Sequence, residues 1–91
     1  MTLAGITVKV MPESVDVNLT ELKKQCEREI YDFYKQVKEL RTEEEPIAFG
    51  LSALKFTFIV DESLGSDAVQ EKLEKLSGVA SVQVVDFRRL T

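Results

Sequence analysis

Histidine is absent from the 91-residue chain, and cysteine occurs once, at position 26. Without histidine the chain lacks the usual general base at neutral pH, the Ser-His-Asp and Cys-His catalytic arrangements and the commonest metal ligand. A single cysteine also excludes an intrachain disulfide and a cysteine-based zinc site. The composition therefore predicts no catalytic residues and no bound metal, and it favours an interaction module over an enzyme.

Positive charge, glycine, proline and long apolar runs are also scarce. Lys and Arg number 12 against 16 Asp and Glu, for a net charge of −4, whereas nonspecific binding to nucleic acid requires a basic surface. No apolar run approaches the ~20 residues of a membrane span, and the N-terminus has no signal-peptide pattern. With 4 Gly, 2 Pro and 44% hydrophobic residues, residues 1–91 are predicted to fold as a single domain. We expect a cytoplasmic protein that binds neither nucleic acid nor a membrane directly.

Three segments show the period-two alternation of half-buried strands. In residues 3–11 the apolar face consists of Ala4, Ile6, Val8 and Val10. In residues 50–60 it consists of Leu54, Phe56, Phe58 and Val60. Gly50 is expected to be a bulge or a point of close backbone approach. Residues 79–89 form the last strand, and their apolar phase shifts near Val84 and Val85, which indicates a bend.

Two helices are predicted between these strands. Asn18 is the expected N-cap of the first, with Glu21 as its capping-box partner. Its apolar stripe is Leu19, Leu22, Cys26, Ile30 and Phe33. Cys26 lies in this stripe, which favours packing over reactivity. After a loop over residues 61–66, the second helix carries Val69, Leu73 and Leu76 on its apolar side.

The segment between the first helix and residue 46 has two interpretations. Val37 and Leu40 continue the helical spacing, which allows one helix from 18 to about 40, whereas aromatic and branched residues after position 30 favour a strand. Residues 43–46, EEEP, are expected to be a solvated acidic turn, because three adjacent carboxylates lack the spacing of a calcium loop. The fold class is a two-layer α+β domain, and a strand at residues 36–42 would make it ferredoxin-like.

Two segments are candidate binding surfaces on physical grounds alone. Residues 46–51, PIAFGL, are almost entirely apolar, and they are either buried at the sheet edge or exposed for a partner. Residues 86–90, DFRRL, are either a frayed terminus or a probe that uses arginine to contact phosphate or carboxylate. Phe56 and Phe58 superficially resemble the base-stacking pair of an RNA-recognition motif, but they are in phase with the core. RNA binding is therefore disfavoured.

Three motifs resemble the archaeal form of translation elongation factor 1-beta, the guanine-nucleotide exchange factor for elongation factor 1-alpha. They are VMPES at 10–14, EEPIAFGLSALKF at 44–56 and VQVVDFRRL at 82–90. The resemblance covers essentially the whole chain. It implies a ferredoxin-like β-α-β-β-α-β fold, with a four-stranded antiparallel sheet and two helices on one face. It also implies a first helix that ends near residue 33 and a second strand at residues 36–42.

The resemblance further implies that the chain binds the GDP form of the GTPase and releases GDP so that GTP can enter. The partner then carries GDP or GTP and Mg²⁺, and this chain binds no cofactor. The implied partner-binding residues are Pro46, Ile47, Phe49, Gly50, Phe87, Arg88, Arg89 and Leu90. Eukaryotic relatives direct a lysine near the C-terminus at the Mg²⁺ site, and residues up to Thr91 include no such lysine. We hypothesise that Arg88 or Arg89 displaces Mg²⁺, or that exchange relies on pushing partner loops.

Two other function classes compete with this interpretation. A ligand-sensing or oligomerising ferredoxin-like regulatory module would have no effect on a GTPase. An acylphosphatase-like enzyme is disfavoured, because the segment VMPESVDVN after the first strand is acidic and glycine-free, which does not suit phosphate binding.

Overall fold

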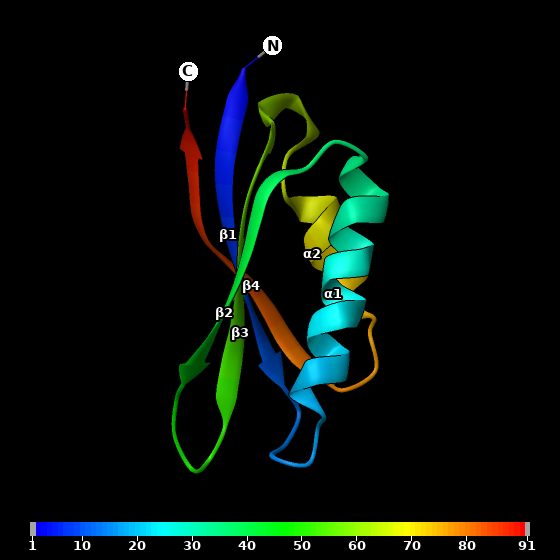
Figure 1. The fold of residues 1–91 in the computed structure, drawn as a ribbon, viewed down its shortest axis with the longest axis vertical. Helices are drawn as coiled ribbons and strands as arrows, with labels where there is room; N and C mark the ends of the chain where they lie inside the picture. Colours follow the sequence, from blue (N-terminus) through cyan, green and yellow to red (C-terminus); the bar gives the residue numbers. More distant parts are fainter. Residues whose placement is uncertain (1, 91) are drawn as a thin grey trace.

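The computed structural model describes residues 2–90 and shows two layers, a four-stranded antiparallel sheet and two α-helices (Figure 1). The elements in chain order are β1 (Leu3–Pro12), α1 (Leu19–Tyr34), β2 (Lys38–Pro46), β3 (Ser52–Asp61), a 3₁₀ turn (Glu62–Leu64), α2 (Asp67–Glu74) and β4 (Val79–Arg89). The strand order in the sheet is β2-β3-β1-β4. The predicted ferredoxin-like β-α-β-β-α-β fold is therefore confirmed. No helix within residues 2–90 is long and apolar enough to cross a membrane.

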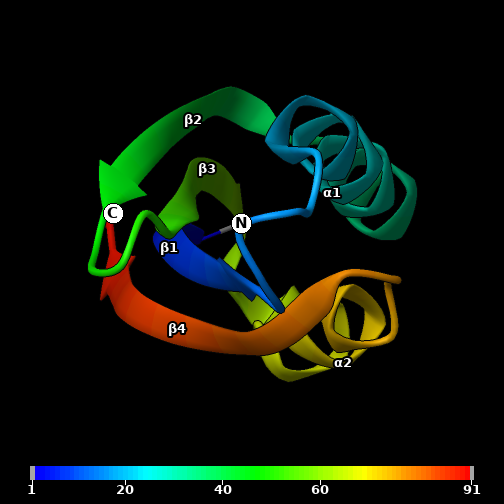
Figure 2. The same cartoon turned by 90° about the horizontal axis from the view of Figure 1, so that it is seen from below.

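Both helices lie on one face of the sheet, and the core fills the space between the layers (Figure 2). The side chains predicted to face the core from the first and third strands are all buried: Ala4, Ile6, Val8, Val10, Leu54, Phe56, Phe58 and Val60. They meet the buried residues of α1 and α2, which are Leu22, Cys26, Ile30, Tyr34, Val69 and Leu73. One-sided burial explains why β1 and β3 alternate so clearly in the sequence.

Helix α1 begins as predicted but ends on a different aromatic residue. The Oδ1 atom of Asn18 accepts a hydrogen bond from the backbone N–H of Glu21 at 3.2 Å, which confirms the N-cap. Phe33, predicted to complete the apolar stripe, is only half-buried, and Tyr34 is buried in its place. The Tyr34 hydroxyl donates a 2.7 Å hydrogen bond to the carbonyl of Gly65, so the ring packs inside while its polar end stays satisfied.

The second strand extends further than the sequence indicated. The interpretation of one helix to residue 40 is wrong, because Lys35 ends α1 with a φ of 65°. Strand β2 runs over Lys38–Pro46 in place of the predicted 36–42, so the EEEP segment is strand and not a solvated turn. Residues 43–46 pair with residues 52–55 of β3, and the Glu45 carboxylate lies 3.3 Å from the Nζ atoms of both Lys9 and Lys55. These hydrogen bonds, first from Lys55 and then from Lys9, lower the pKa of Glu45.

The structure contradicts one of the two remaining expectations about the strands and confirms the other. Gly50 is not a bulge within β3: it lies in the loop before that strand, with a φ of 78°. Strand β4 covers the predicted residues 79–89, and the phase shift is a β-bulge. Val84 lies opposite Val8 and Asp86 opposite Thr7, which leaves Val85 as the extra residue.

Candidate partner-binding surface

The structure places the two candidate segments at opposite ends of the molecule. The hairpin tip (residues 46–51) joins β2 to β3 at the lower end in Figure 1, and the C-terminal segment (residues 86–90) lies at the upper end beside the N-terminus. Phe87 is opposite Ile6, whereas Leu54 is opposite Val10 and leads back to the tip. At about 3.3 Å per residue along the strands, the two segments are roughly 25 Å apart. One small contact patch on a partner therefore cannot cover both.

The hairpin tip holds Phe49 away from the rest of the protein. Its side chain is 96% exposed, and its φ of 55° lies in the left-handed region that non-glycine residues avoid. The loop is closed by hydrogen bonds from the N–H of Ile47 to the carbonyl of Leu51 at 2.9 Å and from the N–H of Leu51 to the carbonyl of Ala48 at 3.0 Å. A strained backbone that presents an uncovered aromatic side chain is typical of a recognition site.

The rest of the tip supports this display. Gly50 follows Phe49 with a positive φ, so the loop turns where glycine has no steric cost. Pro46 is the last residue of β2 and is exposed, and Ile47 is half-exposed. The sequence left two alternatives for residues 46–51, burial at the sheet edge or exposure to a partner. The structure shows exposure, because these residues are not buried at the sheet edge.

Val15 joins this surface, although sequence reasoning missed it. Its side chain is 61% exposed in the loop between β1 and α1. A Cβ atom added at Gly50 would lie 3.6 Å from Cγ1 of Val15, so the two loops touch. Val15, Ile47 and Phe49 together form an exposed apolar cluster, which we call the apolar tip. The signal in the sequence was the antiparallel order of β1 and β3, which brings the end of one strand beside the start of the other.

The C-terminal segment is ordered strand and not a frayed terminus. Phe87 lies opposite Ile6 in β1, and the backbone N–H of Leu90 donates to the carbonyl of Leu3 at 2.8 Å. The side chains of Phe87 and Leu90 are nonetheless half-exposed. The segment therefore combines a fixed backbone with apolar side chains that are available to a partner.

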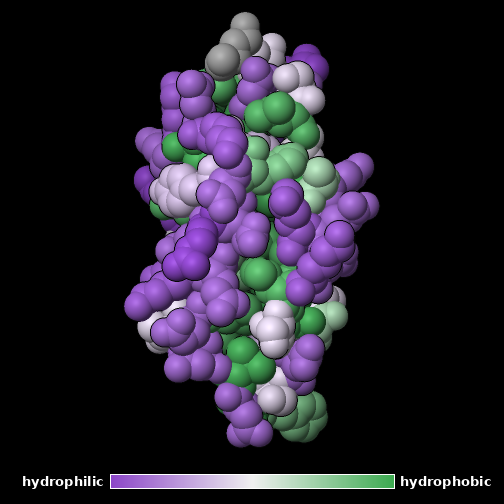
Figure 3. Space-filling view, turned by 90° about the vertical axis from the view of Figure 1, so that its right-hand side faces the viewer, coloured by the Kyte–Doolittle hydropathy of each residue, from purple (hydrophilic) through white to green (hydrophobic). Residues whose placement is uncertain are grey.

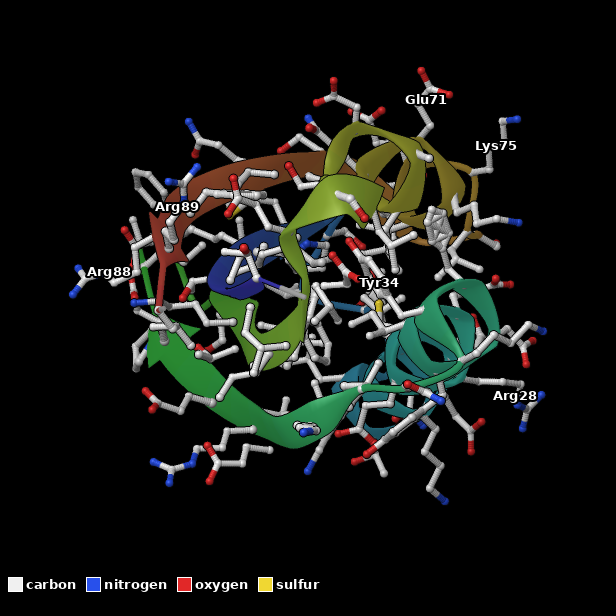
Figure 4. The ribbon with its side chains drawn as sticks, turned by 90° about the horizontal axis from the view of Figure 1, so that it is seen from above. Arg28, Tyr34, Glu71, Lys75, Arg88 and Arg89 are labelled. Atoms are coloured by element: carbon white, nitrogen blue, oxygen red, sulfur yellow. The ribbon has the colours of Figure 1, made fainter. Side chains whose placement is uncertain are left out.

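Its two arginines differ in how tightly they are held. Arg89 forms a two-pronged ion pair with Glu62, with Nε–Oε2 and Nη2–Oε1 distances of 2.8 and 2.9 Å. These bonds lower the pKa of Glu62 and raise that of Arg89. Arg88 makes a single 3.1 Å contact with Asp86, and its side chain is 70% exposed. In Figure 4 it extends away from the sheet on the side opposite to the helices, so it is the more available cation.

The helix layer offers less to a partner. Hydrophilic side chains cover most of this face, and hydrophobic surface shows as a patch near the upper end, a narrow seam below it and spots near the lower end (Figure 3). Cys26 is buried beneath α1, and burial, followed by the charges of Glu27 and Glu29, raises the pKa of its thiol to about 12. The thiol is therefore held in its neutral, unreactive form, as the packing interpretation predicted.

A ferredoxin-like domain that exposes an apolar tip and an arginine-bearing strand end has the form of a protein-interaction module. Comparison with known proteins gives the family. The model of the EF-1 guanine nucleotide exchange domain matches residues 5–90. The chain belongs to this family, which confirms the resemblance to elongation factor 1-beta and the class of guanine-nucleotide exchange factors in translation elongation.

Individual relatives agree over nearly the whole chain. Elongation factor 1-beta of Methanothermobacter thermautotrophicus is 45% identical over 85 residues, which are 92% of each protein. That of Methanosarcina barkeri is 46% identical over 87 residues, covering 91% of this chain and 92% of the relative. Among solved structures, the C-terminal domain of the MgtC protein from Mycobacterium tuberculosis superposes with a TM-score of 0.62 at 13% identity, covering 97% of this chain and 88% of that one. This last similarity concerns the fold alone.

Proposed function

We propose that this protein binds elongation factor 1-alpha, the GTPase of translation elongation, and accelerates GDP release so that GTP can enter. The main support for the proposal is Phe49. Its aromatic side chain is 96% exposed on a strained loop, so burial against a partner would release a large amount of favourable free energy. The membership in the exchange domain family supplies the class of partner. GDP, GTP and Mg²⁺ are ligands of the GTPase, and this chain contributes contacts only.

The physical mechanism is coupling between two ligands of the GTPase. A factor that binds the nucleotide-free form more tightly than the GDP form weakens GDP binding by the same factor. Each tenfold reduction in GDP affinity requires about 1.4 kcal/mol of differential binding. No group that performs covalent chemistry is needed for this effect, and a rigid domain with two separated contacts is well suited to it.

The two contacts have different roles in this proposal. The apolar tip anchors the factor, because its side chains lose water when a partner covers them. The C-terminal segment acts on the nucleotide site, roughly 25 Å away along the strands. Strands β1 and β3 connect the two through the buried core, so the distance between them is fixed.

Within the C-terminal segment we assign the electrostatic role to Arg88. A guanidinium brought close to the Mg²⁺ site repels the metal ion and weakens its hold on GDP. Arg88 is exposed and has only one contact, whereas Arg89 is fixed by Glu62. Arg89 instead keeps the end of β4 attached to the 3₁₀ turn, while Phe87 and Leu90 press on the partner's loops.

The test is release of fluorescent GDP from purified elongation factor 1-alpha with this protein present at substoichiometric amounts. Acceleration over many turnovers supports the proposal, and no acceleration of a GTPase shown to exchange after Mg²⁺ removal overturns it. Arg88→Ala is expected to lower the maximal rate more than Arg89→Ala. Equal, full activity of both variants would refute the electrostatic role and leave displacement of partner loops as the mechanism.

A further inference from the structure

A pocket of about 340 Å³ lies at the upper end of the molecule in Figure 1, between the connection from α1 to β2 and the end of β3. We call it the upper pocket. Its buried lining comes from Tyr34 and Val60, and Leu3 and Leu64 add further apolar lining. Figure 4 looks onto this end and shows Tyr34 between α1 and the sheet. A concave site of this size, mostly apolar with a few polar groups, is typical of sites that bind small molecules.

The backbone around the upper pocket departs from regular structure. Lys35, which ends α1, has a φ of 65°, and Glu39 in β2 has a φ of 53°. They are two of the three non-glycine residues with a positive φ within residues 2–90. Glu39 lies in the register irregularity between Lys38 and Arg41, where β2 has one residue more than β3. Strained residues and β-bulges are concentrated next to binding sites, because they direct groups that a regular strand holds elsewhere.

Two lysines line the upper pocket without an anionic partner. Lys35 and Lys38 are exposed, and neither forms an ion pair with another described residue. Asp61 also belongs to the lining, but its Oδ1 atom accepts bonds from the backbone N–H and the Oγ of Ser63 at 3.0 and 2.9 Å. Two lysines and one aspartate leave the lining with a net charge of +1, which an anion would neutralise.

The backbone of Asp61 adds a third donor. Alternate residues of an antiparallel strand direct their N–H and C=O groups to opposite sides. The N–H of Glu62 donates to the carbonyl of Thr2, so Asp61 directs its own N–H away from β1 and towards the side of β2. The pairing of β2 begins with Lys38 opposite Ile59, so no residue of β2 as described lies opposite Asp61. Its N–H is therefore available at the edge of the pocket.

These features favour an anion with a single charge and an apolar body. Carboxylate oxygens accept hydrogen bonds from ammonium and backbone N–H groups, while the apolar lining covers the rest of the ligand. Helix α1 ends at the pocket, and the partial negative charge of its last carbonyls disfavours a doubly charged phosphate. We propose that the upper pocket binds a small organic carboxylate with an aromatic or branched apolar body, held by Lys35, Lys38 and the N–H of Asp61.

The upper pocket adjoins the part of the chain that holds the C-terminal segment. Asp61 and Leu64 lie on either side of Glu62 in the chain, and the Glu62 carboxylate binds Arg89 at 2.8 and 2.9 Å. A bound carboxylate restrains the 3₁₀ turn and thereby the end of β4, so exchange activity responds to the ligand. This consequence rests on the proposed function. The binding itself does not, and its test contains no GTPase.

The experiment follows the amide NMR spectrum of the isolated, isotope-labelled protein during titration with phenylpropionate. Saturable shifts are expected at residues 34–38 and 59–64, with a dissociation constant of about 1 mM or lower. Phenylpropanol and phenylpropylamine have the same apolar body with a neutral or a positive group, and each should bind at least about tenfold more weakly. Inorganic phosphate should cause no saturable shifts at these residues. Equal affinity for the three organic compounds, or no saturation by phenylpropionate up to about 10 mM, overturns the proposal.

Paired variants test the two lysines. Lys35→Gln combined with Lys38→Gln should weaken phenylpropionate binding by about tenfold or more. The weak binding of phenylpropanol should be unchanged, which shows that the pocket is still formed. Lys23→Gln combined with Lys24→Gln is the matched control, because it removes the same charge from exposed positions on α1 that do not line the pocket. An equal loss of affinity in the control would reduce the effect to general attraction of anions and overturn the assignment of the site.

A second pair of variants tests the apolar lining. Leu64 is 48% exposed and Val85 on β4 is 44% exposed, so an aspartate at either position leaves the core intact. Leu64→Asp should abolish saturable binding of phenylpropionate, because it places a like charge where the apolar body packs. Val85→Asp should bind as the wild type does. Wild-type affinity in the Leu64 variant would show that the ligand lies outside the upper pocket.

Discussion

Replacing Phe49 by alanine is expected to remove most of the exchange activity and leave the stability of the fold unchanged. The ring is 96% exposed, so its removal uncovers no core surface and opens no cavity. Alanine keeps the same backbone with the same left-handed φ. The free energy of unfolding should therefore change by less than about 0.5 kcal/mol, whereas Phe56→Ala in the buried core should cost about 3–5 kcal/mol.

The effect on exchange follows from what the ring gains when a partner covers it. Complete burial of a phenylalanine side chain is worth about 1.5–3 kcal/mol. At about 1.4 kcal/mol per tenfold change, kcat/KM for GDP release should fall by about tenfold to about 150-fold. Because the tip serves as an anchor, the loss should appear as a higher concentration of factor needed for half-maximal rate. Arg88→Ala should show the opposite pattern, with a lower maximal rate.

The assay follows release of fluorescent GDP from elongation factor 1-alpha over a range of factor concentrations, together with urea unfolding of each variant. Tyr31→Ala is the control, because Tyr31 is another aromatic residue, 51% exposed, on α1 and away from the tip. Full activity of the Phe49 variant would refute the role of the apolar tip. An equal loss in the Tyr31 variant would move the contact to the helix layer, and lost stability in the Phe49 variant would show that the ring serves the fold.

Three further outcomes follow from the core and from the end of β4. Tyr34→Phe removes the hydroxyl that donates to the carbonyl of Gly65 at 2.7 Å and should lower the free energy of unfolding by about 1 kcal/mol in urea titrations; no change would contradict that bond. Arg89 lowers the pKa of Glu62, so their pair stabilises the fold above the unfolded pKa of Glu62 and loses this effect as pH falls through the lowered folded pKa. The melting temperature of the wild type should therefore fall more steeply with acid than that of Glu62→Gln, and parallel curves would count against the pair. The thiol of Cys26, with its pKa raised to about 12, should react with a thiol reagent at least about 100-fold more slowly in the native protein than in urea, and rapid native labelling would disprove its burial.

The parts of the fold that the sequence predicts are those in which one face of an element is buried. Strands β1 and β3 lie in the interior of the sheet order, with helices over one face only, so burial imposes a strict alternation on Ile6, Val8, Phe56 and Phe58. The cap at Asn18 is equally local, because its bond reaches only three residues along the chain.

Strand β2 was harder to predict because its backbone and ion-pair partners are distant in sequence. It is an edge strand with exposed side chains on both faces, and Glu45 is held by Lys9 and Lys55, neither of which is adjacent in sequence. The choice between Phe33 and Tyr34 depends in the same way on a contact with Gly65, 31 residues away. Helical periodicity alone does not contain that information.

The candidate site shows the same difference between features that are local in sequence and features that depend on distant residues. The sequence singles out residues 46–51 as an apolar run after an acidic segment and residues 86–90 as an apolar and arginine-rich end, but it leaves their exposure open. The structure decides this, with Ile47, Phe49 and Phe87 exposed. Val15 was missed because it belongs to the site only through the loop packed against it, at Gly50. The separation of the two segments also needed the register of the sheet. Their role in binding stays a prediction.

The place of β1 in the sheet has a consequence for biosynthesis. The strand made first lies between β3 and β4, and residues Ala4 to Pro12 pair with the strand made last. A growing chain therefore exposes an unpaired flank of its central strand until residues 79–89 have been synthesised. Closing the sheet needs contacts between β1 and β4, which are far apart in sequence; this slows folding and delays it until β4 has been synthesised. Chaperones that shield apolar strand edges would have their main opportunity on this protein in that interval.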